Sequence, residues 1–274
     1  MPGGLRRAIL SWMDRAGVVS VLRKAEQAAE LPRLGGMARA EGVVIASERF
    51  WAFARRDGSV SEGVMPAPPA AVRRVPLLRG LVKLGLALAP LFSGTGVARP
   101  RERALLLVAL LAPLSLIFLP HAASLPVGIA TAVVLLAWLL RGRTLFLHGA
   151  EHRAIAAVEE GSLLATWSGA ARPTRFSPRC GTNFAALVLP VSVAAERLWP
   201  LSAAIYTPFA VTLLSLALTM ELWQLVQASR YRVARAFLLP GLALQRLTTR
   251  EPSDEETRIA LTAVASVLQR ELSP

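Results

Sequence analysis

The chain has 274 residues, of which 54% are hydrophobic and only 18% are charged, and this balance excludes an ordinary soluble domain. The formal net charge is +13, yet the basic residues flank apolar segments and do not alternate with aromatic residues, so we expect no nucleic acid partner. We expect instead a lipid bilayer as partner, with anionic lipid head groups against a basic cytoplasmic face.

Residues 1–68 are predicted to form a cytoplasmic N-terminal region with short β-strands. The runs "GVVIAS", "RFWAFAR" and "GSVSEGV" are rich in β-prone residues. The last two are joined through Asp57 and Gly58, a dipeptide typical of β-hairpin turns. The region is therefore predicted to be a small β meander.

Residues 69–100 are predicted to contain a linker and an interfacial amphipathic helix. The linker is the stretch "MPAPPAAV", and the apolar run that follows covers residues 77–92. Arg79 and Lys83 lie four residues apart, on one face of a helix in that run. We therefore favour a helix lying on the membrane over a fifth membrane span.

Four apolar runs predict an α-helical polytopic membrane protein with about four transmembrane helices arranged as two hairpins. The first hairpin covers residues 101–143, where basic residues lie outside both apolar runs and none lies between them. The second covers residues 182–228 and is followed by the basic stretch "SRYRVARA". The positive-inside rule then places both chain termini in the cytoplasm.

Two further cytoplasmic regions complete the predicted organisation. Residues 144–181 form a loop that contains histidine, glutamate and cysteine, and residues 229–274 form the C-terminal region. In the latter, the stretch from Ser253 to Leu272 starts with a serine and acidic residues, which is the usual start of a helix. We therefore expect a cytoplasmic C-terminal helix.

Two of the chain's three histidines lie in "FLHGAEHRAIAAVEEG". On a helix, His148, Glu151 and His152 share one face, so both imidazoles could reach one cation. The spacing H-x-x-E-H is also found in zinc proteases, where the glutamate acts on a metal-bound water. A pair of interfacial histidines that binds no metal remains the alternative interpretation.

Cys180, in "RFSPRCGTNF", is the best candidate for a third ligand because it precedes the third predicted span. Two histidines and one cysteine suit zinc and leave one position open for water. Glu159 lies seven residues beyond His152, about 10 Å along a helix, which is too far to share a metal ion with it. Glu159 is therefore expected to orient a residue next to a metal ligand or to bind substrate. Alternatively, Cys180 is a small buried residue in a tight turn between Arg179 and Gly181.

The chain resembles the YqhQ-like bacterial membrane proteins, a family of unknown function that is predicted to comprise metal-dependent enzymes. The similarity is carried in order by "GGMARAEGV" at 35–43, "PLLRG" at 76–80, "HGAEH" at 148–152, "PRCGTNF" at 178–184 and "PGLALQRLTTREP" at 240–252, with Glu159 where the family has a glutamate. The resemblance implies a multi-pass protein of the bacterial cytoplasmic (inner) membrane. It also supports a divalent metal held by His148, His152 and Cys180, and zinc is the metal that this ligand set suits.

Two positions depart from the family pattern. Ser177 stands where the family has a histidine before P-R-C-G-T, and Met37 stands where it has a glutamine. If that histidine is a metal ligand in the family, there are three alternatives here. A water molecule takes its position, another residue such as Glu41 supplies the ligand, or this protein has lost the metal.

The sequence thus gives a leading hypothesis and a competitor. In the first, the protein is a metal-dependent hydrolase at the cytoplasmic membrane surface, with Glu151 as general base. In the second, it is a non-catalytic membrane scaffold or binding protein with a structural metal or none. Homo-oligomerisation stays open in both. The residues expected around the metal or against substrate are Glu41, Glu159, Arg179 and Asn183.

Overall fold

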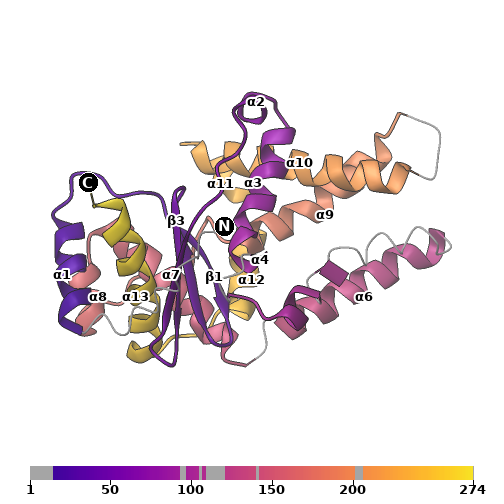
Figure 1. Ribbon diagram of the computed structural model, residues 1–274. Coiled ribbons are helices and arrows are strands. Elements are labelled where there is room, and N and C mark those ends of the chain that lie inside the picture. The colour runs from indigo at the N-terminus through magenta and orange to yellow at the C-terminus, as the bar shows by residue number, and fades with distance from the viewer. Residues whose placement is uncertain are drawn as a thin grey trace, which may run out of the picture.

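The computed structural model describes residues 15–92, 97–104, 107–108, 121–139, 142–200 and 206–273. Figure 1 shows a four-stranded sheet surrounded by helices and, beside it, helices that extend away from the sheet. The first group is referred to below as the sheet body.

The antiparallel meander predicted for the N-terminal region is present. Its strands are paired in chain order and comprise β1 (Gly35–Arg39), β2 (Gly42–Ala46), β3 (Phe50–Arg55) and β4 (Val60–Val64). In the β3–β4 turn, Gly58 has a φ of 85°, which a residue with a side chain adopts only at a cost. The backbone N–H of Ser59 donates to the Asp57 carboxylate at 2.9 Å. These two residues therefore account for the predicted hairpin.

Both faces of the sheet are covered, because side chains alternate between faces along each strand. On β2, Val43 and Ile45 join the larger buried cluster, whereas Val44 joins a smaller one. The smaller cluster also contains Trp51, Phe53 and Leu91. The larger cluster is completed by helices α1 (Arg15–Glu26), α7 (Thr144–Glu160), α8 (Leu163–Ser168) and α13 (Asp254–Glu271).

Helices α7 and α13 form the layer on this larger face (Figure 1). Helix α7 is buried over almost its whole length and ends at Gly161, whose φ is 64°. The expected C-terminal helix is α13. It begins with a capping box in which Ser253 and Glu256 satisfy each other's backbone N–H groups. The site described below lies on α7, so it is supported by the most deeply buried helix of the sheet body.

The remaining described helices are α2 (Ala70–Arg73), α3 (Leu78–Ala87), α4 (Ala89–Phe92), α6 (His121–Leu139), α9 (Gly181–Arg197), α10 (Thr207–Ala228), α11 (Arg232–Ala236) and α12 (Leu239–Thr248). Helix α10 packs against α9 and α3. Glu221 on α10 accepts hydrogen bonds from Arg79 on α3 at 2.5 and 2.8 Å. The apolar segment expected to lie on a membrane is thus attached to α10 by an ion pair.

The prediction of four membrane-spanning helices in two hairpins is wrong. In the described ranges, one helix is long and apolar enough to cross a membrane, Phe209–Ala228 within α10. The third predicted span became α9, whose 17 residues end in Glu196 and Arg197, so its apolar part is shorter than the roughly 20 residues that usually span a bilayer. The first predicted span, 105–120, lies almost wholly outside the described residues. Much of the apolar composition is instead used inside the sheet body, where α7 and α13 are buried by packing.

Candidate metal centre

The centre of the site is the stretch of α7 that carries the two histidines. The segment after α12 passes across this stretch, and the backbone N–H of Arg250 donates to the Leu145 carbonyl at 2.9 Å. A Cβ atom added to Gly149 would lie 2.1 Å from the Arg250 carbonyl oxygen. Glycine is therefore required here, because the two backbones approach so closely.

His148 is held in one orientation by this crossing segment. Its Nδ1 atom donates to the Thr248 carbonyl oxygen at 2.8 Å. The other ring nitrogen, Nε2, is then the lone-pair side, and it lies 3.3 Å from Cys180 Sγ. The imidazole therefore presents its unprotonated nitrogen to the cysteine.

His152 is oriented in the same way by a different carbonyl. Its Nδ1 atom donates to Arg175 O at 2.7 Å. Its Nε2 atom is buried and has no hydrogen-bond partner among the residues that the structure describes. A buried polar atom without a partner is costly, and it requires an explanation such as an ion or a water molecule. The ring centroids of His148 and His152 lie 4.5 Å apart, so both free nitrogens are in one small region.

Cys180 brings the third ligand atom from the start of α9. It is the N-cap residue, and its sulfur accepts hydrogen bonds from the Thr182 backbone N–H at 3.5 Å and from the Thr182 hydroxyl at 3.3 Å. These donors favour the thiolate, as does the positive end of the helix dipole. The ligand atoms of His148, His152 and Cys180 all lie within 4.8 Å of one another, so the cluster could hold a metal ion.

A network of amide groups fixes the turn that carries Cys180. The Gln245 side chain of α12 accepts from the Ser177 N–H at 2.8 Å and donates to the Ser177 carbonyl at 2.7 Å. The buried Asn183 side chain donates to the carbonyls of Ser177 and Pro178. Both amides thus hold the turn by its backbone, which leaves the cysteine side chain free to point at the histidines.

Burial keeps the groups of the site neutral in the absence of a cation. It lowers the pKa of His148, and it lowers that of His152 to about 3, with a further contribution from His148. It raises the pKa of the Cys180 thiol to about 11, against the hydrogen bonds from Thr182. A divalent cation would reverse the last effect, because a nearby positive charge favours the thiolate. The donor set therefore fits a soft divalent metal such as zinc.

Glu151 lies beside the cluster without joining it. Its carboxyl group accepts a hydrogen bond from the Ala38 backbone N–H on β1, and its negative charge would raise the pKa of Cys180. A Cβ atom at Gly36 would lie 3.0 Å from the Glu151 side chain, so the strand is close. Complete burial raises the pKa of Glu151 to about 8. The carboxyl group therefore holds a proton that it can exchange near neutral pH.

The other residues selected from the sequence lie at different places. Glu41 is in the β1–β2 turn and pairs with Arg99 at 2.6 Å, outside the cluster. Glu159 forms an ion pair with Arg179 further along α7. The Ser177 hydroxyl accepts from the Arg179 backbone N–H at 3.2 Å, so it stabilises the turn before Cys180.

Sequence reasoning missed the groups that orient the ligands. Gln245 and the carbonyls of Thr248 and Arg175 have no characteristic spacing from the histidines. Gln245 and Thr248 do lie in "PGLALQRLTTREP", one of the segments similar to the YqhQ-like family. That similarity was the one available signal, because every residue has a backbone carbonyl group and the residue type does not show which one accepts a hydrogen bond.

Comparisons with known proteins agree with the resemblance. A family model described as a protein of unknown function (DUF1385) matches residues 127–270, a segment that contains all three candidate ligands. The uncharacterized protein YqhQ of Bacillus subtilis (strain 168) is 31% identical over 128 residues. The aligned part makes up 45% of this chain and 40% of that protein, so less than half of the relative is spanned. No solved structure matches the chain.

Proposed function

This chain belongs to the DUF1385 family of proteins of unknown function, and we propose that it is a metal-dependent hydrolase. His148 Nε2, His152 Nε2 and Cys180 Sγ bind one divalent cation, zinc. Three protein ligands leave one position of a tetrahedral zinc for a ligand from outside the protein, which is the pattern of catalytic sites.

One observation carries the proposal. His152 Nε2 is buried without a partner, in a region where the structure places two other ligand atoms within 4.8 Å. Both histidines donate through Nδ1 to backbone carbonyls, which fixes the tautomer that metal-binding histidines adopt. A histidine pair that binds no metal would give no reason for a buried Nε2 atom of His152 to lack a partner beside His148 and Cys180.

The chain's own residues then suit hydrolysis. A bound zinc ion would supply Lewis-acid activation of water at neutral pH. Glu151, whose carboxyl group lies against β1 beside Cys180, is the residue we assign as general base, because a cation bound beside it would favour its ionised form. The Ala38 N–H keeps its carboxyl group in place during proton transfer.

The competing function is a scaffold with a closed, structural zinc. It is favoured by the strong burial of His148 and His152, which are 8% and 2% exposed. The two functions differ in one property: a catalytic site exchanges its fourth ligand with solvent, and a structural site does not.

Cobalt substitution tests this difference directly. We expect Co²⁺ bound to the detergent-purified protein to show a thiolate charge-transfer band that Cys180→Ser abolishes. Azide should change the visible spectrum of bound cobalt, because it enters the exchangeable position. Glu151→Gln should keep the cobalt spectrum and lose turnover in a hydrolase screen. A spectrum that azide leaves unchanged would support the structural site and contradict the hydrolase.

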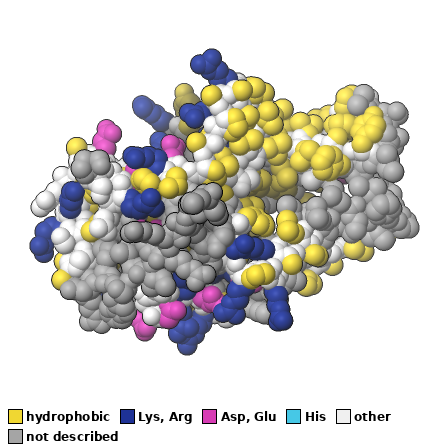
Figure 2. Space-filling view, in the orientation of Figure 1, with side chains coloured by type: hydrophobic (Ala, Val, Ile, Leu, Met, Phe, Trp, Pro, Cys, Tyr) yellow, Lys and Arg dark blue, Asp and Glu magenta, His cyan; other side chains and the backbone are white. Residues whose placement is uncertain are grey.

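We also propose that the protein acts at the bacterial cytoplasmic membrane. Helix α10 is long and apolar enough to cross a bilayer, and 28% of its apolar window is buried inside the protein. Figure 2 shows hydrophobic side chains gathered over the helices that extend from the sheet body, and most Lys and Arg side chains lie outside that area. Arg230 and Arg235 follow α10, so the positive-inside rule places the metal centre on the cytoplasmic side, near anionic lipid head groups.

A further inference from the structure

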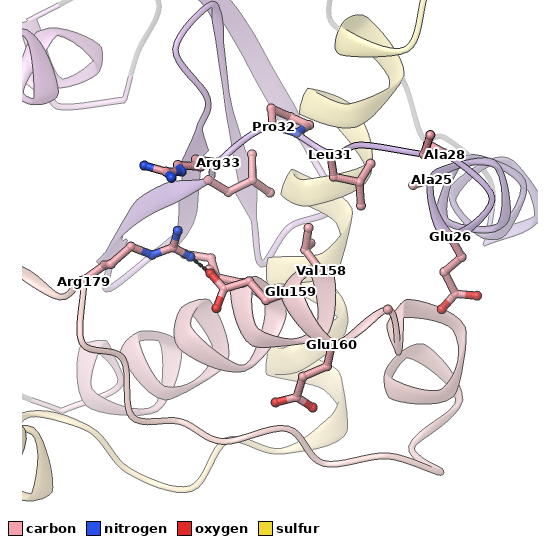
Figure 3. A pocket seen from close by; sticks show the side chains of 14 residues that line it. Ala25, Glu26, Ala28, Leu31, Pro32, Arg33, Val158, Glu159, Glu160 and Arg179 are labelled. Carbon is pink, nitrogen blue, oxygen red and sulfur yellow. Dashed lines mark ion pairs between the residues drawn. The ribbon is translucent and has the colours of Figure 1, made fainter. Parts of the chain in front are cut away.

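A cavity of about 500 Å³ lies beside the second half of α7 (Figure 3). This volume is in the range of pockets that bind small molecules. Its walls come from α1, from the connection between α1 and β1, from α7, and from the segment that leads into α9. The cavity shares no lining residue with the His148, His152 and Cys180 cluster, so it is a separate site.

Two arginines meet at one end of this cavity. Figure 3 shows Arg33 on the connection before β1 and Arg179 on the segment before α9, with Glu159 between α7 and Arg179. Arg179 pairs with Glu159, whereas Arg33 has no hydrogen-bond or ion-pair partner among the described residues. Two like charges therefore lie close together with one carboxylate to balance them.

The opposite end of the cavity is acidic. Glu26 and Glu160 lie away from the arginines in Figure 3. Glu26 also accepts a hydrogen bond from the Leu164 backbone N–H at 2.9 Å, which holds its carboxylate at that end. A polyanion that filled the cavity would be repelled there. The charges therefore favour a ligand with a single anionic group.

The basic end is close to the metal centre along the chain. Arg179 directly precedes Cys180, and Ile155 of the cavity wall is one helical turn beyond His152. Glu159 is seven residues beyond His152, about 10 Å along the helix axis. The basic end of the cavity and the metal centre therefore lie about 10 Å apart along α7.

We propose that Arg33 and Arg179 bind a phosphomonoester group that anchors the substrate, while the bond to be hydrolysed lies about 10 Å away at the metal centre. Two guanidinium groups match the charge and the three free oxygens of a phosphomonoester. A carboxylate would satisfy one of them, and Glu159 already serves that role. The inference that the cavity binds phosphate depends on the cavity alone. The inference that this phosphate group belongs to the substrate rests on the proposed hydrolase function.

Calorimetric titration of the full-length, detergent-purified, zinc-free protein tests this. The probes are glycerol 3-phosphate and dihexanoylphosphatidic acid, which carry the same phosphomonoester without and with acyl chains. We expect Arg33→Gln to weaken binding about tenfold or more, because a charge-assisted hydrogen bond is lost. Arg73→Gln, which removes an exposed arginine of α2 outside the cavity, should leave binding unchanged.

The two probes identify the source of the phosphate. Binding of both, with loss in Arg33→Gln, supports a soluble phosphoester, and binding of the phospholipid alone supports a lipid head group. Arg179→Lys keeps the positive charge but removes the planar guanidinium group, which can donate two parallel hydrogen bonds to phosphate. It should therefore also weaken binding. Binding that is absent in the wild type, or equal in wild type and Arg33→Gln, would overturn the proposal.

Zinc uptake by separate portions of the same proteins, measured after incubation with zinc, separates this proposal from the hydrolase. Arginine-dependent phosphate binding in a protein that takes up no zinc would retain the phosphate site and reject the hydrolase. Stoichiometric zinc together with phosphate binding that Arg33→Gln does not affect would reject the phosphate site and retain the metal centre of the proposed hydrolase.

Discussion

Each histidine of the site uses one ring nitrogen for the fold and keeps the other free. The Nδ1 atoms of His148 and His152 donate to Thr248 and Arg175, so neither ring can turn without losing a buried hydrogen bond. The free nitrogens are therefore placed before any metal binds. This preorganisation is the reason that a change at a neighbouring residue should affect metal affinity.

Gly149→Ala should destabilise the protein by about 2 kcal/mol, because the new methyl group overlaps the Arg250 carbonyl and no side chain can yield. It should also move Thr248 away from His148 and weaken zinc binding. Denaturant unfolding and zinc titration would measure both effects. Gly142→Ala is not a fair control because its φ is positive, so Gly85→Ala is the control, since a Cβ atom there meets no described atom within 4 Å. Equal stability of Gly149→Ala and wild type would refute this packing argument.

The three ligand residues could be found from the sequence, whereas their supports could not. His148 and His152 are four residues apart in a chain with three histidines, and Cys180 is the single cysteine. Helical spacing and residue chemistry were sufficient there. The partners of their Nδ1 atoms are backbone carbonyls at positions 175 and 248, and such contacts depend on tertiary packing that no local pattern encodes.

At the scale of elements, the site is formed where α7, α9 and the end of α12 meet. Helix α12 packs against α9, and Gly241 permits this contact, since a Cβ atom there would lie 2.2 Å from the Asn183 side chain. Gln245 on α12 and Asn183 on α9 then hold the same turn before Cys180. The geometry of the ligands thus depends on how two helices pack.

Gln245→Met should lower zinc affinity about 10- to 100-fold, as the loss of groups that orient ligands does in other metal sites. The substitution keeps the volume but removes both hydrogen bonds to Ser177. Competition with a chelator of known affinity would measure the change. Gln269→Met, at an exposed position of α13, is the matched control. If both variants bound zinc like the wild type, the hydrogen bonds from Gln245 to Ser177 would not be needed to position Cys180.

The segment that crosses α7 is also fixed by an ion pair, which makes stability depend on pH. Glu251 pairs with the buried Arg153, whose hydrogen bond lowers the pKa of Glu251. A carboxyl group with a lowered pKa stabilises the fold above its unfolded value near 4.5, and this contribution is lost as pH falls through the folded pKa.

Glu251→Gln should therefore cost roughly 1 kcal/mol at pH 7, a value kept small because the carboxylate is 59% exposed. The difference from wild type should shrink as pH is lowered below about 4. Denaturant unfolding at both pH values provides the measurement. A difference that is the same at pH 7 and in acid would show that the charge of Glu251 has no role.

At the scale of the whole molecule, the chain combines a packed sheet body with helices that carry exposed apolar residues. Composition could not separate these two uses of apolar side chains. The stretch 144–181, expected as a cytoplasmic loop beside the membrane, contains α7, which packs against β1 and β2 and lies beside α13. Runs with clear capping or turn signals, such as Ser253 and Asp57–Gly58, were predicted correctly because those signals are local.

Membrane attachment through α10 predicts the effect of a charge at its centre. Leu218 lies near the middle of Phe209–Ala228 and is 38% exposed. Leu218→Asp should cost about 3 kcal/mol on insertion and release more of the protein in alkaline carbonate extraction. Val233→Asp, at a position that is 78% exposed beyond α10, should behave like wild type. Identical extraction of all three proteins would argue against insertion of α10.

Binding of one metal ion by His148, His152 and Cys180 underlies the proposed function, and the zinc content of the purified protein measures it. Inductively coupled plasma mass spectrometry should find close to one zinc per chain in wild type and in Glu151→Gln. It should find almost none in His152→Ala and Cys180→Ser. Folded wild-type protein that remains without metal after incubation with zinc, or zinc that persists in both ligand variants, would contradict the account.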